Sequence, residues 1–150
     1  MHTVNFLNSS QGVLTSKDLF HTLKSINVCS GDIVTVQSNL IPLGFPPNSI
    51  SKEKFLDVFI DVLLEILGND GVLIFPTFTF NSCKNKRFDL NSTKSEVGVL
   101  TERARLRIDS TRTCHPFLSF VVFSRKGHIL TRPNNSTCFG KGSFFDILHE

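Results

Sequence analysis

At 150 residues, the chain has room for a single domain, and we expect that domain to span residues 1–150. Its hydrophobic share of 40% and charged share of 19% exclude an intrinsically disordered protein, because disordered chains have too little apolar surface to bury. The net charge of +3 is mildly basic, and it does not distinguish a nucleic-acid-binding module from a protein that binds a phosphate-bearing cofactor.

The first predicted helix begins after Thr15 or Ser16, either of which is a suitable N-cap. Its apolar residues recur at helical spacing, at Leu19, Phe20, Leu23 and Ile26. A Ser-Gly-Asp turn follows, and residues 33–38 then have the apolar character of a strand. The chain therefore begins with a helix that leads into a strand.

The second predicted helix covers residues 52–67 and follows Ser51, a good N-cap. Gly68 ends this helix. Most of its residues are apolar, which predicts a largely buried helix. The exceptions recur every four residues and form one acidic stripe, which we expect on the outward, solvated edge: Glu53, Asp57, Asp61 and Glu65.

Helices and strands alternate through the rest of the chain. The continuous apolar run 72–75 is typical of a strand covered on both faces, and a polar loop over 81–96 comes next. A short helix over 100–107, a strand over 119–124 and a short strand over 128–130 follow. This alternation predicts an α/β fold in which helices pack on a mixed β-sheet in α/β/α layers. Because the last residues resemble the start of a further element, we expect the fold to be incomplete at its C-terminus.

The chain also carries signals about its compartment. Its longest apolar stretch is interrupted by carboxylates and falls short of the roughly 20 apolar residues that cross a bilayer. The N-terminus has neither the basic nor the apolar region of a signal peptide. Four widely spaced cysteines predict free thiols: Cys29, Cys83, Cys114 and Cys138. We therefore expect a cytoplasmic protein with no membrane partner.

Two groups of polar residues suggest binding chemistry. Four arginines cluster around the third helix, at Arg103, Arg105, Arg107 and Arg112, and they form either a solvated face or a phosphate site. Three cysteines and His115 have the wrong spacing for paired zinc ligands, so we expect no metal. Aromatic residues are not interleaved with the basic ones as in a stacking platform, which disfavours nucleic acid as a partner.

Five blocks of sequence, in order, carry a more specific signal. They are Gly31–Leu40 with Leu43-Gly44; Gly71–Thr79; Phe88-Asp89 with Thr93, Ser95, Gly98, Leu100 and Glu102; Arg112–Pro116 with Ser119-Phe120; and Phe139-Gly140 with Ser143 and Leu148. The first is similar to the motif G-D-x-V-x-V-H-S-S-L, and the second to G-T-L-V-x-P-T-F-T. Together they resemble the aminoglycoside 3-N-acetyltransferase family, and they cover nearly the whole chain.

The resemblance implies that the substrate amine attacks the thioester carbonyl of acetyl-coenzyme A while a general base accepts its proton. It places the pantetheine arm of the cofactor along Ser38, Asn39, Leu40, Thr77, Phe78, Thr79, Ser119 and Phe120. Glu102 and Asp89 are the carboxylates expected to face a cationic amino sugar. His115 is the candidate base within the chain, although the histidine that serves as base in the family corresponds to a position beyond Glu150.

Several readings stay open. The chain departs from the family pattern where Gln37 replaces a histidine and Asn39 replaces a serine. The substrate is either an aminoglycoside or an amino sugar of surface-polysaccharide synthesis. Alternatively, the chain is a non-catalytic remnant that binds coenzyme A or a partner protein, or it is a basic nucleic-acid-binding module. An uncovered sheet edge would also allow the chain to associate with itself.

Overall fold

The structure is a computed structural model that describes residues 3–9, 12–85, 87–125, 129–133 and 136–150. Its centre is a four-stranded sheet in the order β3-β4-β6-β5. These strands are β3 (Ile33–Thr35), β4 (Val72–Pro76), β6 (Phe120–Phe123) and β5 (Thr111–Arg112). β3 and β4 are parallel, whereas β6 runs antiparallel to both β4 and β5. The predicted mixed sheet is confirmed, with β5 as an additional strand.

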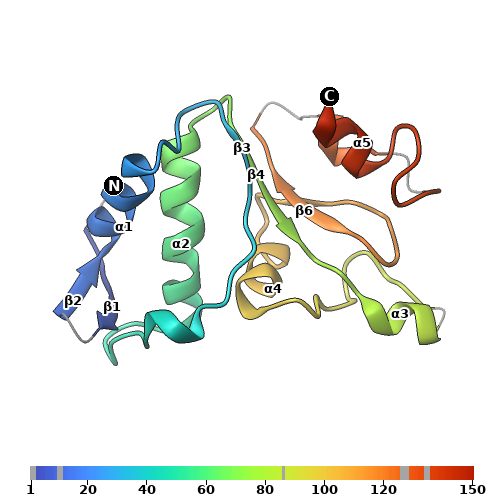
Figure 1. Cartoon of the computed structure of the whole chain (residues 1–150). Coiled ribbons are helices and arrows are strands. Elements are labelled where there is room, and N and C mark those ends of the chain that lie inside the picture. The colour runs from blue at the N-terminus through green and yellow to red at the C-terminus, as the bar shows by residue number, and fades with distance from the viewer. Residues whose placement is uncertain (1–2, 10–11, 86, 126–128, 134–135) are drawn as a thin grey trace.

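β4 is the core strand of the sheet, and all five of its residues are buried. Its side chains alternate between two apolar clusters. Leu73 and Phe75 pack with α2 (Lys52–Leu67) and α4 (Val99–Arg105) on one face. Val72 and Ile74 pack on the other face, where Phe144 of the C-terminal helix covers them. As Figure 1 shows, helices lie on both sides of the sheet, so the α/β/α layering is confirmed.

The second helix has the predicted bounds, and Ser51 caps it by accepting a hydrogen bond from the Lys54 amide. The first helix, α1 (Ser16–Ser25), is capped by Thr15 in a capping box with Asp18. A hairpin that the sequence did not predict precedes it, formed by β1 (Asn5–Ser9) and β2 (Gly12–Thr15). Phe6 of β1 is 2% exposed, which makes the hairpin part of the main core.

Two other expectations need correction. The predicted loop 81–96 begins as a helix, α3 (Phe80–Asn85), because tertiary packing of the Phe80 ring on Phe117 stabilises this short polar segment. Ile129–Thr131 forms a 3₁₀ turn, η2, where a strand was predicted, and His128 lies outside the described residues. The final element is α5 (Phe144–His149), which Ser143 caps. η1 (Ile41–Leu43) is a second 3₁₀ turn.

The acidic stripe of α2 is exposed at Glu53, Asp61 and Glu65 but not at Asp57, so the expectation of a solvated edge holds only in part. The Arg103 guanidinium of α4 binds Asp57, and Arg107 binds both Asp61 and Asp109. The Asp57 side chain is only 17% exposed. Because these arginine charges are matched by carboxylates, this part of the arginine cluster is neither a solvated face nor an open phosphate site.

Within the described ranges, no helix has the length and apolar content needed to cross a membrane.

Candidate functional site at the strand ends

A cavity of about 420 Å³ opens where the parallel strands β3 and β4 end. Parallel strands place their carboxyl ends at the same sheet edge, which is where open α/β sheets usually bind ligands. The pairing of β3 with β4 continues past Thr35, because the Val36 amide donates to the Ile74 carbonyl over 2.9 Å. The lining comes from the end of β4, from the segments after β3 and β4, and from residues in and just before α4: Gln37, Ser38, Asn39, Pro76, Phe78, Val97 and Thr101.

The segment before α4 closes the third side of this strand-end cavity. The Glu96 amide donates a 2.9 Å hydrogen bond to the carbonyl of Phe78, which fixes residues 96–98 against the end of β4. Gly98 follows with a φ of 142°, a conformation that residues with a side chain rarely adopt. A Cβ atom at this position would lie 3.9 Å from the Ser38 carbonyl oxygen, an ordinary contact distance, so the backbone conformation alone favours glycine. Glycine thus lets the chain turn into α4 beside the loop that follows β3.

The lining is polar but uncharged. It offers side-chain amides from Gln37 and Asn39, hydroxyl groups from Ser38 and Thr101, and the ring of Phe78. Among the described residues that line it, none has a side chain that titrates near neutral pH. Such a surface suits a neutral ligand that is rich in amide groups and has an apolar segment.

Four of the residues predicted to contact the cofactor lie behind this lining. Thr77, Thr79 and Ser119 are 0% exposed, and Phe120 is 3% exposed. The Ser119 hydroxyl donates to the Thr77 carbonyl over 2.8 Å, and the Thr79 hydroxyl donates to the Pro116 carbonyl over 2.6 Å. These side chains therefore hold the strand ends together. Of the predicted set, Ser38, Asn39 and Phe78 line the cavity, and Leu40 packs against the main core.

Arg112 joins this buried network from β5. Its guanidinium donates to the Thr77 carbonyl and the Ser119 hydroxyl, and also to two carbonyls of the loop that carries Asp89. Burial lowers the pKa of Arg112 to about 10, which still leaves the side chain charged at neutral pH. Sequence reasoning placed Arg112 in a surface cluster, although it stands in the matched block Arg112–Pro116.

Of the two predicted substrate carboxylates, Glu102 forms an ion pair with Arg105, whereas Asp89 lies in the turn that contains Asn91. Burial raises the pKa of Glu102, but hydrogen bonds from Arg105 and the Ser95 amide outweigh this effect, and the net shift is downward. The pKa of Asp89 is lowered by hydrogen bonds from Ser92 and Asn91 in an exposed turn. Arg105 also donates to the Asn91 carbonyl, which brings the Asp89 turn close to Glu102.

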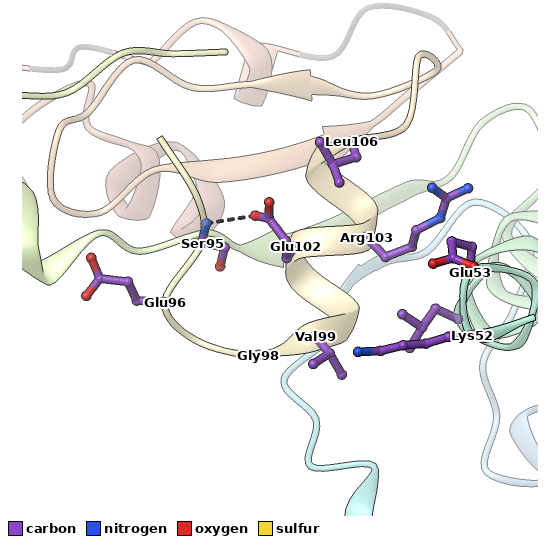
Figure 2. A pocket seen from close by; sticks show the side chains of 10 residues that line it. Lys52, Glu53, Ser95, Glu96, Gly98, Val99, Glu102, Arg103 and Leu106 are labelled. Atoms are coloured by element: carbon purple, nitrogen blue, oxygen red, sulfur yellow. Dashed lines mark hydrogen bonds between the residues drawn. The ribbon is translucent and has the colours of Figure 1, made fainter. Parts of the chain in front are cut away.

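A second hollow of about 410 Å³ lies between the N-terminal end of α2 and one side of α4, and Figure 2 shows it from close by. Lys52 and Glu53 reach it from α2, while Val99, Glu102 and Arg103 reach it from α4 (Figure 2). The dashed line in Figure 2 marks the bond from the Ser95 amide to Glu102, 2.8 Å long. This α2–α4 groove and the strand-end cavity thus share the segment 95–102 as a common wall.

His115 lies in the loop before β6, and both of its ring nitrogens are engaged. Nδ1 accepts hydrogen bonds from the amides of Phe117 and Leu118, at 3.2 and 3.0 Å. The proton of the neutral ring is therefore on Nε2, which lies 3.4 Å from the Cys138 sulfur. Burial lowers the pKa of His115, which keeps the ring neutral. In this arrangement neither nitrogen is open to accept a proton from a substrate amine.

The cysteines do not gather into a site in the part of the chain that the structure describes. Cys29, Cys114 and Cys138 are free thiols, and the Cys83 side chain lies outside the described residues. Across the described ranges, no three histidine, cysteine, aspartate or glutamate side chains are grouped so that they could hold a metal ion.

A comparison with known protein families matches residues 48–150 to the aminoglycoside 3-N-acetyltransferases. The match includes the strand-end cavity from Pro76 onward and the loop that contains His115. The chain belongs to this family. The matched region contains α2, β4, α4 and β6, which supply most of the core described above.

Several solved structures share the fold of this chain. The YokD protein from Bacillus subtilis aligns with a TM-score of 0.74 at 18% identity, over 89% of this chain and 60% of its own. AAC-IIIb in a binary complex with coenzyme A aligns with a TM-score of 0.71 at 18% identity, over 89% of this chain and 55% of its own. Sisomicin-bound AAC-VIa aligns with a TM-score of 0.71 at 19% identity, over 89% of this chain and 55% of its own. The chain thus spans little more than half the length of these proteins.

Among curated protein sequences, no match to this chain was found.

Proposed function

We propose that residues 1–150 form the cofactor-binding, N-terminal portion of an acetyltransferase that moves the acetyl group of acetyl-coenzyme A to an amino group of an aminoglycoside. The observation that carries this proposal is the strand-end cavity, because it is uncharged and rich in amide and hydroxyl groups. The pantetheine arm of coenzyme A is likewise neutral and contains two amides. Family membership and the coenzyme A complex of AAC-IIIb support the same assignment.

The substrate amine would approach from the side of Glu102 and Asp89. Both carboxylates have lowered pKa values and are therefore charged at neutral pH, as recognition of a cationic amino sugar requires. The Asp89 side chain stands in an exposed turn, whereas Glu102 is held by Arg105, so Asp89 is the more accessible of the two. The structure of AAC-VIa with the aminoglycoside sisomicin supports a substrate of this class.

In the transfer step, the amine nitrogen bonds to the thioester carbonyl carbon, the carbon–sulfur bond breaks, and the amine proton passes to a base. The residues lining the strand-end cavity supply no such base, and His115 is engaged at both nitrogens. The described residues around the cavity therefore support cofactor binding better than transfer. The working compartment we propose is the cytoplasm, where acetyl-coenzyme A is available and free thiols persist.

Isothermal titration with coenzyme A tests the proposal with a matched pair of variants. Val97 lines the strand-end cavity and Val99, two residues later, lines the α2–α4 groove. Val97→Trp fills the cavity, so we expect it to weaken binding by about tenfold or more, whereas Val99→Trp leaves the affinity within about twofold.

If Val99→Trp weakens binding more than Val97→Trp does, coenzyme A binds in the α2–α4 groove instead of the strand-end cavity. If the folded wild-type chain gives no heat with millimolar coenzyme A, the assignment of the cofactor is wrong.

A further inference from the structure

Arg112 is a buried cation that binds backbone groups from separate parts of the chain. Only 9% of the residue is exposed, and none of the described carboxylates forms an ion pair with it. Nη2 donates to the Thr77 carbonyl over 3.1 Å, and Nε donates to the Ser119 hydroxyl over 3.2 Å. Nη1 donates to the carbonyls of Leu90 and Thr93, at 3.1 and 2.5 Å.

These acceptors come from three segments. Thr77 and Ser119 also bind each other directly, and Arg112 adds the carbonyls of Leu90 and Thr93 to this pair. Thr77 directly follows β4 and precedes Phe78, which lines the strand-end cavity. Ser119 directly precedes β6, and Leu90 and Thr93 flank the turn after Asp89. One guanidinium group therefore fixes the cavity wall and the Asp89 turn relative to each other.

The chemistry of this contact requires arginine. A guanidinium is planar and directs its N–H groups to several sides at once, whereas a lysine ammonium donates from a single atom. The Arg112 Cζ atom lies 5.0 Å from the centre of the Phe88 ring, and this contact further fixes the plane of the guanidinium. Burial of a charge is unfavourable unless hydrogen bonds compensate, and here each of the three nitrogens has an acceptor.

We propose that Arg112 is a positioning residue, which holds the Phe78 wall of the cavity and the Asp89 turn at a fixed spacing and so controls cofactor affinity without lining the cavity. This inference rests on the proposed binding of coenzyme A. Arg103 and Arg107 have a different role, because their guanidinium groups bind carboxylates. Arg103 binds Asp57, and Arg107 binds Asp61 and Asp109.

The experiment compares Arg112→Gln with Arg107→Gln, because both replace a largely buried guanidinium but only the first touches the cavity wall. Urea unfolding at the titration temperature first shows whether both variants are folded there. Titration of coenzyme A at that temperature should then show affinity lowered about tenfold by Arg112→Gln, the size expected for lost hydrogen bonds to a charged group. Arg107→Gln should leave the affinity within about twofold. The affinity of Arg112→Lys for coenzyme A should lie between those of Arg112→Gln and the wild type. If Arg112→Gln does not fold, Arg112→Lys takes its place in the comparison.

Amide hydrogen exchange gives a second readout that needs no ligand. We expect Arg112→Gln to speed exchange at residues 77–79 and 88–96 more than elsewhere, and Arg107→Gln to leave those segments unchanged. Equal effects of the two variants on affinity and on local exchange would overturn the inference and assign Arg112 to stability alone. If the wild-type chain does not bind coenzyme A, the proposed function fails, and the exchange data still decide whether Arg112 positions these segments.

Discussion

The Arg103 guanidinium of α4 binds the Asp57 carboxylate of α2 through two hydrogen bonds, of 2.8 and 2.7 Å. The two residues are 46 positions apart in the sequence, and their pair joins α2 to α4 on the face of the sheet that carries the main core. It also lies on one side of the α2–α4 groove, where Arg103 is among the lining residues (Figure 2). The position of α4, and hence of the segment 95–98 that closes the cavity, therefore depends on an ion pair as well as on apolar packing.

The first prediction concerns this pair. Replacing Asp57 by Asn or Arg103 by Gln should each lower the free energy of unfolding by about 1–2 kcal/mol, because the pair is partly buried and has two well-aligned hydrogen bonds. The double variant should lose less than the sum of the two single losses. Urea unfolding of the four proteins measures this coupling, with the exposed Lys17→Gln as a control that should change little. Additive losses would show that the two side chains do not interact.

The second prediction concerns pH. Burial lowers the pKa of His115 below its ordinary value of 6.5, so the unfolded chain takes up a proton at this residue more readily than the folded protein does. The resulting contribution to stability is complete above pH 6.5 and is lost as the pH falls through the folded pKa. His115→Asn should therefore flatten the decline in stability just below pH 6.5.

Below that range, a second decline comes from carboxylates. The pKa of Asp109 is held below 3.8 chiefly by hydrogen bonds from Arg107, so its contribution is present above pH 3.8 and is lost at lower pH. This second decline should be the same in His115→Asn and in the wild type. Thermal unfolding at a series of pH values measures both declines, and the exposed His149→Asn serves as the control. An unchanged profile of His115→Asn above pH 5 would contradict the assignment of the buried neutral ring.

The third prediction concerns turnover. The 150-residue chain should bind coenzyme A yet acetylate kanamycin-type and gentamicin-type amines at least about 100-fold more slowly than a full-length relative, because general-base catalysis contributes roughly that factor or more. A thiol-release assay measures the rate. Size-exclusion chromatography in parallel tests the expected self-association through the edge strands β3 and β5. Robust turnover by a monodisperse monomer would reject both expectations and would make His115 the first residue to mutate.

Much of the fold followed from local sequence patterns. The bounds of α2 could be predicted because its N-cap Ser51, its apolar periodicity and its terminal Gly68 are all local signals. β4 could be predicted because a strand buried on both faces is a continuous apolar run. The hairpin β1–β2 and α3 were missed, since their residues are polar or irregular and their stability comes from packing against distant rings.

For the site, the sequence by itself determined the family pattern and therefore the segments after β3 and β4 that we assign to the cofactor. Ser38, Asn39 and Phe78 do line the cavity. Only the tertiary structure decided that Thr77, Thr79 and Ser119 turn inward, that Arg112 links them to the Asp89 turn, and that the acidic stripe of α2 meets the arginines of α4. The reason is physical: a sequence pattern records which residue types recur, whereas the partner of a buried hydroxyl or guanidinium is set by which distant segments the fold brings within hydrogen-bonding distance.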